Sequence, residues 1–121
     1  MASVLIVDDS GFQRSIIRKH MEDDGHNVEE AVNGLDALEK IKIKVPDIML
    51  LDILMPGLDG TQVLQELAKL GLKFPVIVVS ADIQETVQKQ CMNLGAVGFV
   101  NKPVKGESLK ALRAMMKAYI G

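Results

Sequence analysis

The sequence predicts an α/β fold in which five helices cover both faces of a doubly wound, five-stranded parallel sheet. Along the 121 residues, five short strand-like segments alternate with five amphipathic segments, and no linker or repeat interrupts them. Continuous apolar runs such as Val4–Val7 and Val76–Val79 are typical of parallel strands that are buried on both faces. The length suits a single core, so we expect residues 1–121 to form one domain.

The first half of the chain predicts three strands and two helices. Ser3–Val7 is an apolar strand, and the helix Ser10–Asp24 that follows carries one less polar face: Phe12, Ile16, Ile17, His20 and Met21. Asn27–Ala31 is more polar and alternates, as an edge strand would. Asn33 is expected to cap a helix with three inward side chains: Leu35, Leu38 and Ile41. The strand Asp47–Leu51 then follows.

The second half predicts two strands and three helices. The loop Pro56–Gly60 leads into a helix with apolar residues at helical spacing: Val63, Leu64, Leu67 and Leu70. The strand Val76–Val79, the helix Ile83–Leu94 and the strand Val97–Val100 come next. The last helix starts near Gly106 and repeats the helical spacing: Leu109, Leu112, Met116 and Ile120.

Right-handed crossovers and a polar second strand favour the sheet order 2-1-3-4-5, as in flavodoxin-like folds. The carboxyl ends of parallel strands share one edge of the sheet, and ligands bind there. Polar residues follow four of the five strands: Asp8-Asp9 after the first, Asp52 after the third, Ser80 after the fourth and Lys102 after the fifth. Three carboxylates, a hydroxyl and an ammonium group are suited to a divalent cation and a phosphoryl group.

The composition limits the classes of partner. A net charge of −2 argues neither for nor against nucleic acid as a partner, and the single cysteine, Cys91, excludes an internal disulfide framework. No apolar run approaches the ~20 residues of a membrane span, and we recognise no signal peptide. We therefore expect a cytoplasmic protein, and a monomer, that binds neither membranes nor nucleic acid through this domain.

Taken in order, these motifs resemble the receiver domain of response regulators, which act in two-component and chemotaxis signalling. The resemblance covers essentially the whole chain and rests on five motifs: Asp8-Asp9, Asp52, Met55–Gly60, Ser80-Ala81 and Lys102-Pro103. It implies that a sensor histidine kinase donates a phosphoryl group to Asp52 and that this switches a protein-interaction surface. The chain would then be a signalling phosphoacceptor that catalyses only its own phosphorylation and slow self-dephosphorylation, rather than an enzyme.

Mg²⁺ is the cofactor that this resemblance implies. Clustered carboxylates repel each other unless a cation neutralises them, and Mg²⁺ takes oxygen ligands and often bridges carboxylates to phosphate. By the resemblance, Asp9 and Asp52 bind the metal directly, Asp8 supports it through water, and the backbone carbonyl of Leu54 is a third protein ligand. The alternative for Asp8 and Asp9 is helix capping together with Ser10, a role that can coexist with metal binding, and the alternative for Asp52 is a helix N-cap or a solvated loop acid.

Four further residues receive roles from the resemblance. Lys102 pairs with a carboxylate at rest and with the phosphoryl group afterwards, and a cis peptide bond joins it to Pro103. The Ser80 hydroxyl donates to a phosphoryl oxygen, unless Ser80 merely caps the fourth helix. Phe99 is either an aromatic switch that responds to Ser80 or a plain core residue, and the sequence does not decide between them.

Several alternatives remain open at this stage. The chain is either a CheY-like single-domain receiver that acts on an unknown target, with a phosphatase as a further partner, or a receiver cut from a longer regulator with a DNA-binding or enzymatic output domain. An aspartyl-nucleophile phosphatase would need a second acid where Leu54 stands, and Asp8-Asp9 would repel a flavin phosphate. We expect Leu54 to shield the phosphoryl group and Asp82 to have a smaller effect on its hydrolysis. The expected output surface comprises the fourth helix, the fifth strand and the last helix, with Ala81, Phe99 and the basic residues from Lys105 to Lys117.

Overall fold

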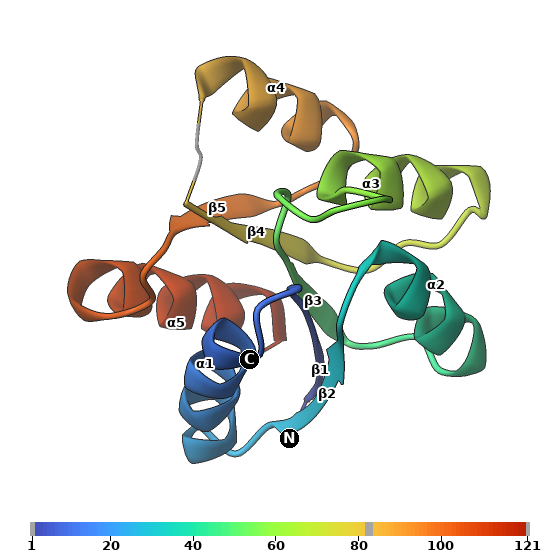
Figure 1. Cartoon of the computed structure of the whole chain (residues 1–121). Helices are drawn as coiled ribbons and strands as arrows, with labels where there is room; N and C mark the ends of the chain where they lie inside the picture. Colours follow the sequence, from blue (N-terminus) through green and yellow to red (C-terminus); the bar gives the residue numbers. More distant parts are fainter. Residues whose placement is uncertain (1, 82–83, 121) are drawn as a thin grey trace.

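The computed structural model describes residues 2–81 and 84–120, and five parallel strands form one sheet at its centre (Figure 1). The strand order is β2-β1-β3-β4-β5, which confirms the predicted topology. The strands are β1 Ser3–Val7, β2 Asn27–Ala31, β3 Ile48–Leu51, β4 Val76–Ser80 and β5 Gly98–Asn101. The polar β2 lies at one edge and pairs only with β1, with Ile6 opposite Glu30.

Helices cover both faces of this sheet. Helices α1 and α5 lie on one face, and α2, α3 and α4 lie on the other (Figure 1). The helices are α1 Gly11–Asp23, α2 Gly34–Ile43, α3 Gly60–Lys69, α4 Glu85–Asn93 and α5 Gly106–Ile120. Side chains cap the first three: Ser10 accepts from the backbone of Gln13, Asn33 from that of Asp36, and Asp59 from that of Gln62.

Two apolar clusters hold the helices against the sheet, because successive strand residues point to opposite faces. In β1, Val4 and Ile6 pack with α1 and α5, whereas Leu5 and Val7 pack with α2 and α3. The central strand β3 is buried along its whole length. This two-sided burial explains why the strands were recognisable as continuous apolar runs.

Three residues that we assigned to the apolar faces of helices are exposed. Phe12 is 74% exposed, Leu35 64% and Leu70 47%. Phe12 lies off the face that buries Ile17 and Met21, and Leu70 is the C-cap of α3 rather than a residue of its inner face. In α2 the small residues Gly34 and Ala37 occupy the inner face together with Leu38 and Ile41.

The element boundaries differ slightly from the predicted ones. Strand β4 extends to Ser80, and β5 begins at Gly98 rather than Val97. Helix α4 begins at Glu85; the predicted start, Ile83, lies outside the described residues. Among the described residues, no helix is both long enough and apolar enough to cross a membrane.

Candidate functional site

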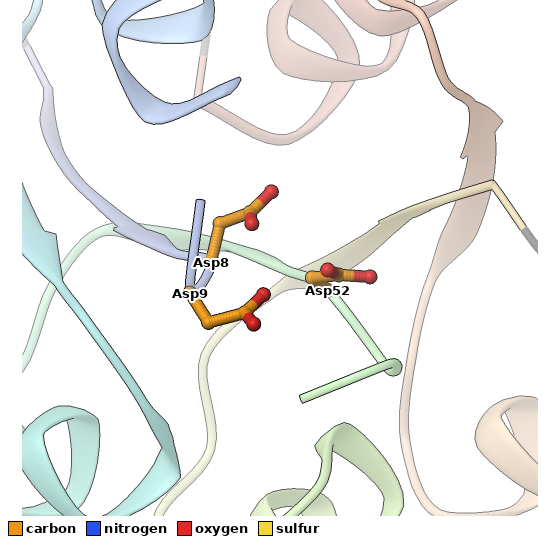
Figure 2. A group of neighbouring side chains, drawn as sticks. All are labelled: Asp8, Asp9 and Asp52. Atoms are coloured by element: carbon orange, nitrogen blue, oxygen red, sulfur yellow. The ribbon is translucent and has the colours of Figure 1, made fainter. Parts of the chain in front are cut away.

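Three carboxylates meet at the carboxyl edge of the sheet. Asp8 and Asp9 directly follow β1, and Asp52 directly follows β3, its neighbour in the sheet. Each offers one oxygen, and these oxygens lie within 4.8 Å of one another (Figure 2). Asp8 and Asp52 are buried, whereas Asp9 is exposed. The predicted meeting of these three residues is therefore observed.

Lys102, at the end of the edge strand β5, bridges two of these carboxylates. It follows β5, and its Nζ lies 2.5 Å from Oδ2 of Asp8 and 3.1 Å from Oδ2 of Asp52. The side chains of Lys102, Asp8 and Asp52 are only 11%, 2% and 5% exposed. The pairing with carboxylates is the one expected from the sequence, and the ammonium group compensates part of a buried negative charge.

Burial and mutual attraction act on the ionisation of this group. Burial raises the pKa of Asp52 above its usual value, and the charge and hydrogen bond of Lys102 offset this only in part. For Lys102, burial acts to lower the pKa, but the hydrogen bond to Asp8 and the charges of Asp52 and Asp8 outweigh it, so the pKa is raised. Lys102 is therefore charged at neutral pH, and burial makes the charged form of Asp52 less favourable in the folded chain than in the unfolded one.

Backbone groups fix the two buried carboxylates. The Oδ1 atom of Asp8 accepts from the backbone N–H of Ser10 at 2.9 Å, and Oδ1 of Asp52 accepts from the N–H of Leu54 at 3.2 Å. The residues that cap α1 and α3 are Ser10 and Asp59. Helix capping, the alternative role considered for Asp8, Asp9 and Asp52, is thus performed by other residues.

A close packing contact positions the loop after Asp52. A Cβ atom added to Gly60 would lie 2.6 Å from the carbonyl oxygen of Asp52 and 2.7 Å from Cα of Ile53. The N–H of Gly60 also donates to the carbonyl of Ile53 at 3.1 Å. The start of α3 therefore rests directly on the backbone of the residue that carries the buried carboxylate.

The other predicted site residues lie around the same edge. Ser80 ends β4 and is fully buried, and its carbonyl accepts from the N–H of Lys102. Gln84 occupies the N-cap position of α4, without a side-chain capping hydrogen bond, so Ser80 is not the N-cap that we considered. The bond between Lys102 and Pro103 is cis, as expected. Phe99 in β5 is half-buried and packs against the core cluster on the α2–α4 side.

Leu54 and Asp82 are the two residues that we expect to affect hydrolysis of the phosphoryl group. The Leu54 side chain is 53% exposed, directly after the loop residue that follows Asp52. Asp82 lies outside the described residues.

The sequence reasoning missed one residue beside the site, Arg14. Its Nη1 donates to the backbone carbonyl of Asp8 at 2.7 Å, and its Nε donates to Glu30 at 2.8 Å. Arg14 stands on α1 and Glu30 on the edge strand β2, 16 positions apart. No local spacing rule links these two residues, and the packing of α1 against β1 and β2 brings them together.

Comparisons with known proteins agree with this geometry. The response regulator receiver domain family matches residues 4–114. The chemotaxis protein CheY of Halobacterium salinarum is 34% identical over 106 residues, which cover 88% of this chain and 88% of that protein. A chain in the crystal structure of the CheX–CheY–BeF3–Mg²⁺ complex of Borrelia burgdorferi is 33% identical with a TM-score of 0.87, covering 98% of this chain and 90% of that one.

Longer proteins contain the same domain. A protein-glutamate methylesterase/protein-glutamine glutaminase of Treponema denticola is 37% identical over 126 residues, which cover 96% of this chain but only 34% of that protein. The chain thus spans only 34% of the Treponema denticola protein and 56% of a virulence-factor transcription regulator of Bordetella pertussis that is 38% identical to it over 118 residues. This chain belongs to the response regulator receiver domain family.

Proposed function

We propose that Asp52 is the residue that accepts the phosphoryl group, with Mg²⁺ as cofactor and a sensor histidine kinase as donor. The observation that carries this proposal is the buried triad in which Lys102 contacts both Asp8 and Asp52, beside the exposed carboxylate of Asp9. A buried, partly neutralised carboxylate next to an open acidic position is the arrangement that phosphoryl transfer to an aspartate needs.

The residues present fit a magnesium ion. Three carboxylate oxygens within 4.8 Å of one another provide hard oxygen ligands, and Asp9 keeps one side of the cluster open to water. In this proposal Asp9, Asp52 and the carbonyl of Leu54 hold the ion directly, and Asp8 holds it through water. Bound there, Mg²⁺ would reduce the repulsion between the carboxylates and an anionic phosphoryl donor.

The transfer itself needs few protein groups. An oxygen of the Asp52 carboxylate attacks phosphorus, the bond from phosphorus to the donor's imidazole nitrogen breaks, and that nitrogen keeps the electron pair and takes up a proton. Lys102 already lies at Asp52, so a small movement of its Nζ would bring it to the new phosphoryl oxygens. The Ser80 hydroxyl is our candidate for a second donor to these oxygens.

The proposed output surface lies beside the site. A depression of about 400 Å³ lies between α4 and β5 and is lined by six residues: Gln88, Lys89, Met92, Asn93, Gly98 and Phe99. We propose that rearrangement of Ser80 and Phe99 after phosphorylation alters this surface for a downstream protein. A phosphatase partner, a monomeric state and a cytoplasmic location stay predictions.

Residues 1–121 either act alone or form the receiver domain of a longer regulator. The match covers 88% of the Halobacterium salinarum protein, so a receiver domain that acts alone has a precedent among the relatives. The match to one third of the Treponema denticola protein is the observation that supports the alternative.

Phosphorylation with a small donor tests the assignment of Asp52. Incubation with acetyl phosphate and Mg²⁺ should add one phosphoryl group per chain, labile to hydroxylamine, and Asp52→Asn should abolish it, as intact-protein mass spectrometry would record. Asp23→Asn, at the exposed end of α1, is the matched control and should react like the parent. Stable labelling of a serine or histidine would contradict the proposal.

Metal binding is tested separately by calorimetry. Mg²⁺ should bind weakly to the free protein and more tightly when beryllofluoride, which mimics a phosphoryl group, occupies Asp52. Asp9→Ala should lose both effects. If Asp9→Ala binds Mg²⁺ as the parent does, the ligand assignment is wrong.

A further inference from the structure

Arg14 ties the loop that carries Asp8 and Asp9 to the edge strand of the sheet. Its guanidinium group makes two directed hydrogen bonds, from Nη1 to the carbonyl of Asp8 at 2.7 Å and from Nε to Oε1 of Glu30 at 2.8 Å. The Arg14 side chain is only 15% exposed. The planar guanidinium fork can satisfy both acceptors at once, which a lysine ammonium on a flexible stem does far less well.

Glu30 is itself firmly held. Its Oε2 accepts from Nη1 of Arg18 at 2.7 Å, and its backbone carbonyl accepts from Nζ of Lys40. The hydrogen bond from Arg18, together with that from Arg14, lowers the pKa of Glu30, so this carboxylate is charged at neutral pH. Glu30 also pairs in register with Ile6, two residues before Asp8. The anchor of Arg14 is thus part of the rigid sheet.

The contact of Arg14 with Asp8 acts on the orientation of Asp9. The carbonyl of Asp8 and the N–H of Asp9 belong to one planar peptide group, so a hydrogen bond that fixes the carbonyl also fixes the plane from which Asp9 extends. Within residues 2–81 and 84–120, the carboxylate of Asp9 has no hydrogen-bond or ion-pair partner of its own. The backbone is therefore what directs this exposed carboxylate toward Asp52.

We propose that Arg14 is a positioning residue for the metal site: held by Glu30, it fixes the Asp8–Asp9 peptide so that the Asp9 carboxylate is pre-oriented for Mg²⁺. This inference rests on the proposed role of Asp9 as a metal ligand. A group that orients a metal ligand without touching the metal typically changes metal affinity by tenfold or more when it is removed.

Charge and position predict opposite effects at this residue. Arg14 is a cation close to a cation-binding site, so its charge alone would weaken Mg²⁺ binding, and removing that charge would strengthen it. Loss of positioning would weaken Mg²⁺ binding instead. The sign of the change therefore separates the two explanations.

Two substitutions at Arg14 and one at Arg18 make the test. Arg14→Met removes the charge and both hydrogen bonds, and Arg14→Lys keeps the charge but loses the fork. We expect both to weaken Mg²⁺ binding about tenfold in calorimetric titration. Arg18→Met is the matched control, because Arg18 also binds Glu30 but contacts no atom of Asp8 or Asp9 within the described residues, and it should stay within twofold of the parent. Parent-like or tighter binding by either Arg14 variant overturns the proposal.

Amide hydrogen exchange in the metal-free proteins gives a second readout that does not depend on Mg²⁺. The N–H of Ser10, which donates to Oδ1 of Asp8, should exchange severalfold faster in both Arg14 variants, whereas amides in β3 should not change. Unchanged exchange at Ser10 would also overturn the proposal. If the parent itself shows no Asp9-dependent Mg²⁺ binding, the metal assignment fails, and the exchange data alone decide whether Arg14 orders the loop.

Discussion

Replacing Lys102 with methionine should destabilise the metal-free protein strongly. The substitution keeps most of the apolar stem but removes the ammonium that lies 2.5 Å from Asp8 and 3.1 Å from Asp52. With an effective dielectric constant of about 20, each pair of charges at about 3 Å attracts by about 5 kcal/mol before the cost of burial is subtracted. Breaking a buried pair by removing one partner leaves an uncompensated charge, and we expect a loss of about 3–5 kcal/mol at pH 7.

Urea unfolding at several pH values is the assay. Without Lys102, Asp52 loses the charge and the hydrogen bond that lower its pKa, so the pKa of Asp52 should rise further above its usual 3.8. The folded state would then bind more protons than the unfolded state between 3.8 and the raised pKa, so the variant gains stability as the pH falls through this window. Its deficit relative to the parent should therefore be largest at neutral pH and shrink on acidification.

A double variant supplies the control for this prediction. Lys102→Met combined with Asp52→Asn removes the cation and one of its two carboxylates, and it should recover much of the lost stability. A loss below about 1 kcal/mol at pH 7, or a deficit that does not depend on pH, would refute the reasoning, because exposed ion pairs contribute that little.

Three other predictions concern the same loops. Asp52→Asn alone should raise the unfolding free energy of the metal-free protein at pH 7, by about 1.4 kcal/mol for each unit of pKa shift, and this gain should vanish below pH 3.8 in urea titrations. Leu54→Asn should speed loss of the phosphoryl group severalfold, worth about 1 kcal/mol, while Asp82→Ala changes it less; an unchanged rate after donor removal in Leu54→Asn contradicts the shielding role. Gly60→Ala should lower the free energy of unfolding by about 1–3 kcal/mol, because the new Cβ would lie 2.6 and 2.7 Å from backbone atoms. Gly11→Ala is the control and should be tolerated, because its Cβ would lie 3.4 Å from the end of the Arg14 side chain. Equal stability of the two variants would argue against the contact at Gly60.

The fold was predictable because its strands are buried on both faces. Continuous apolar runs and a polar edge strand led to the observed order and, within a residue or two, to the observed boundaries. The predictions for Phe12 and Leu35 were wrong because they relied on the size of the apolar side chain and not on its angular position around the helix. Phe12 lies about 140° around α1 from Ile17 and faces water, since a helix advances about 100° per residue. In α2, Gly34 and Ala37 are small enough to let the helix approach its neighbours, and Leu35 points outward.

The sequence predicted those site residues that directly follow a parallel strand. Parallel strands bring their carboxyl ends to one edge, which places Asp8, Asp9, Asp52 and Lys102 together regardless of their distance in sequence. The contact of Arg14 with the Asp8 carbonyl depends instead on how α1 leans over β1 and β2, and on the reach of one long side chain. Such contacts follow from packing in three dimensions, and no spacing in the sequence encodes them.

The residue that carries the phosphoryl group can be identified chemically. After reaction with acetyl phosphate and Mg²⁺, borohydride reduces an aspartyl phosphate to homoserine, and peptide mass spectrometry then locates the change. We expect homoserine at position 52, in a yield that falls sharply when Mg²⁺ is removed or Asp9 is replaced by alanine. Homoserine at position 8 or 9, or a yield that does not depend on Mg²⁺, would contradict this expectation.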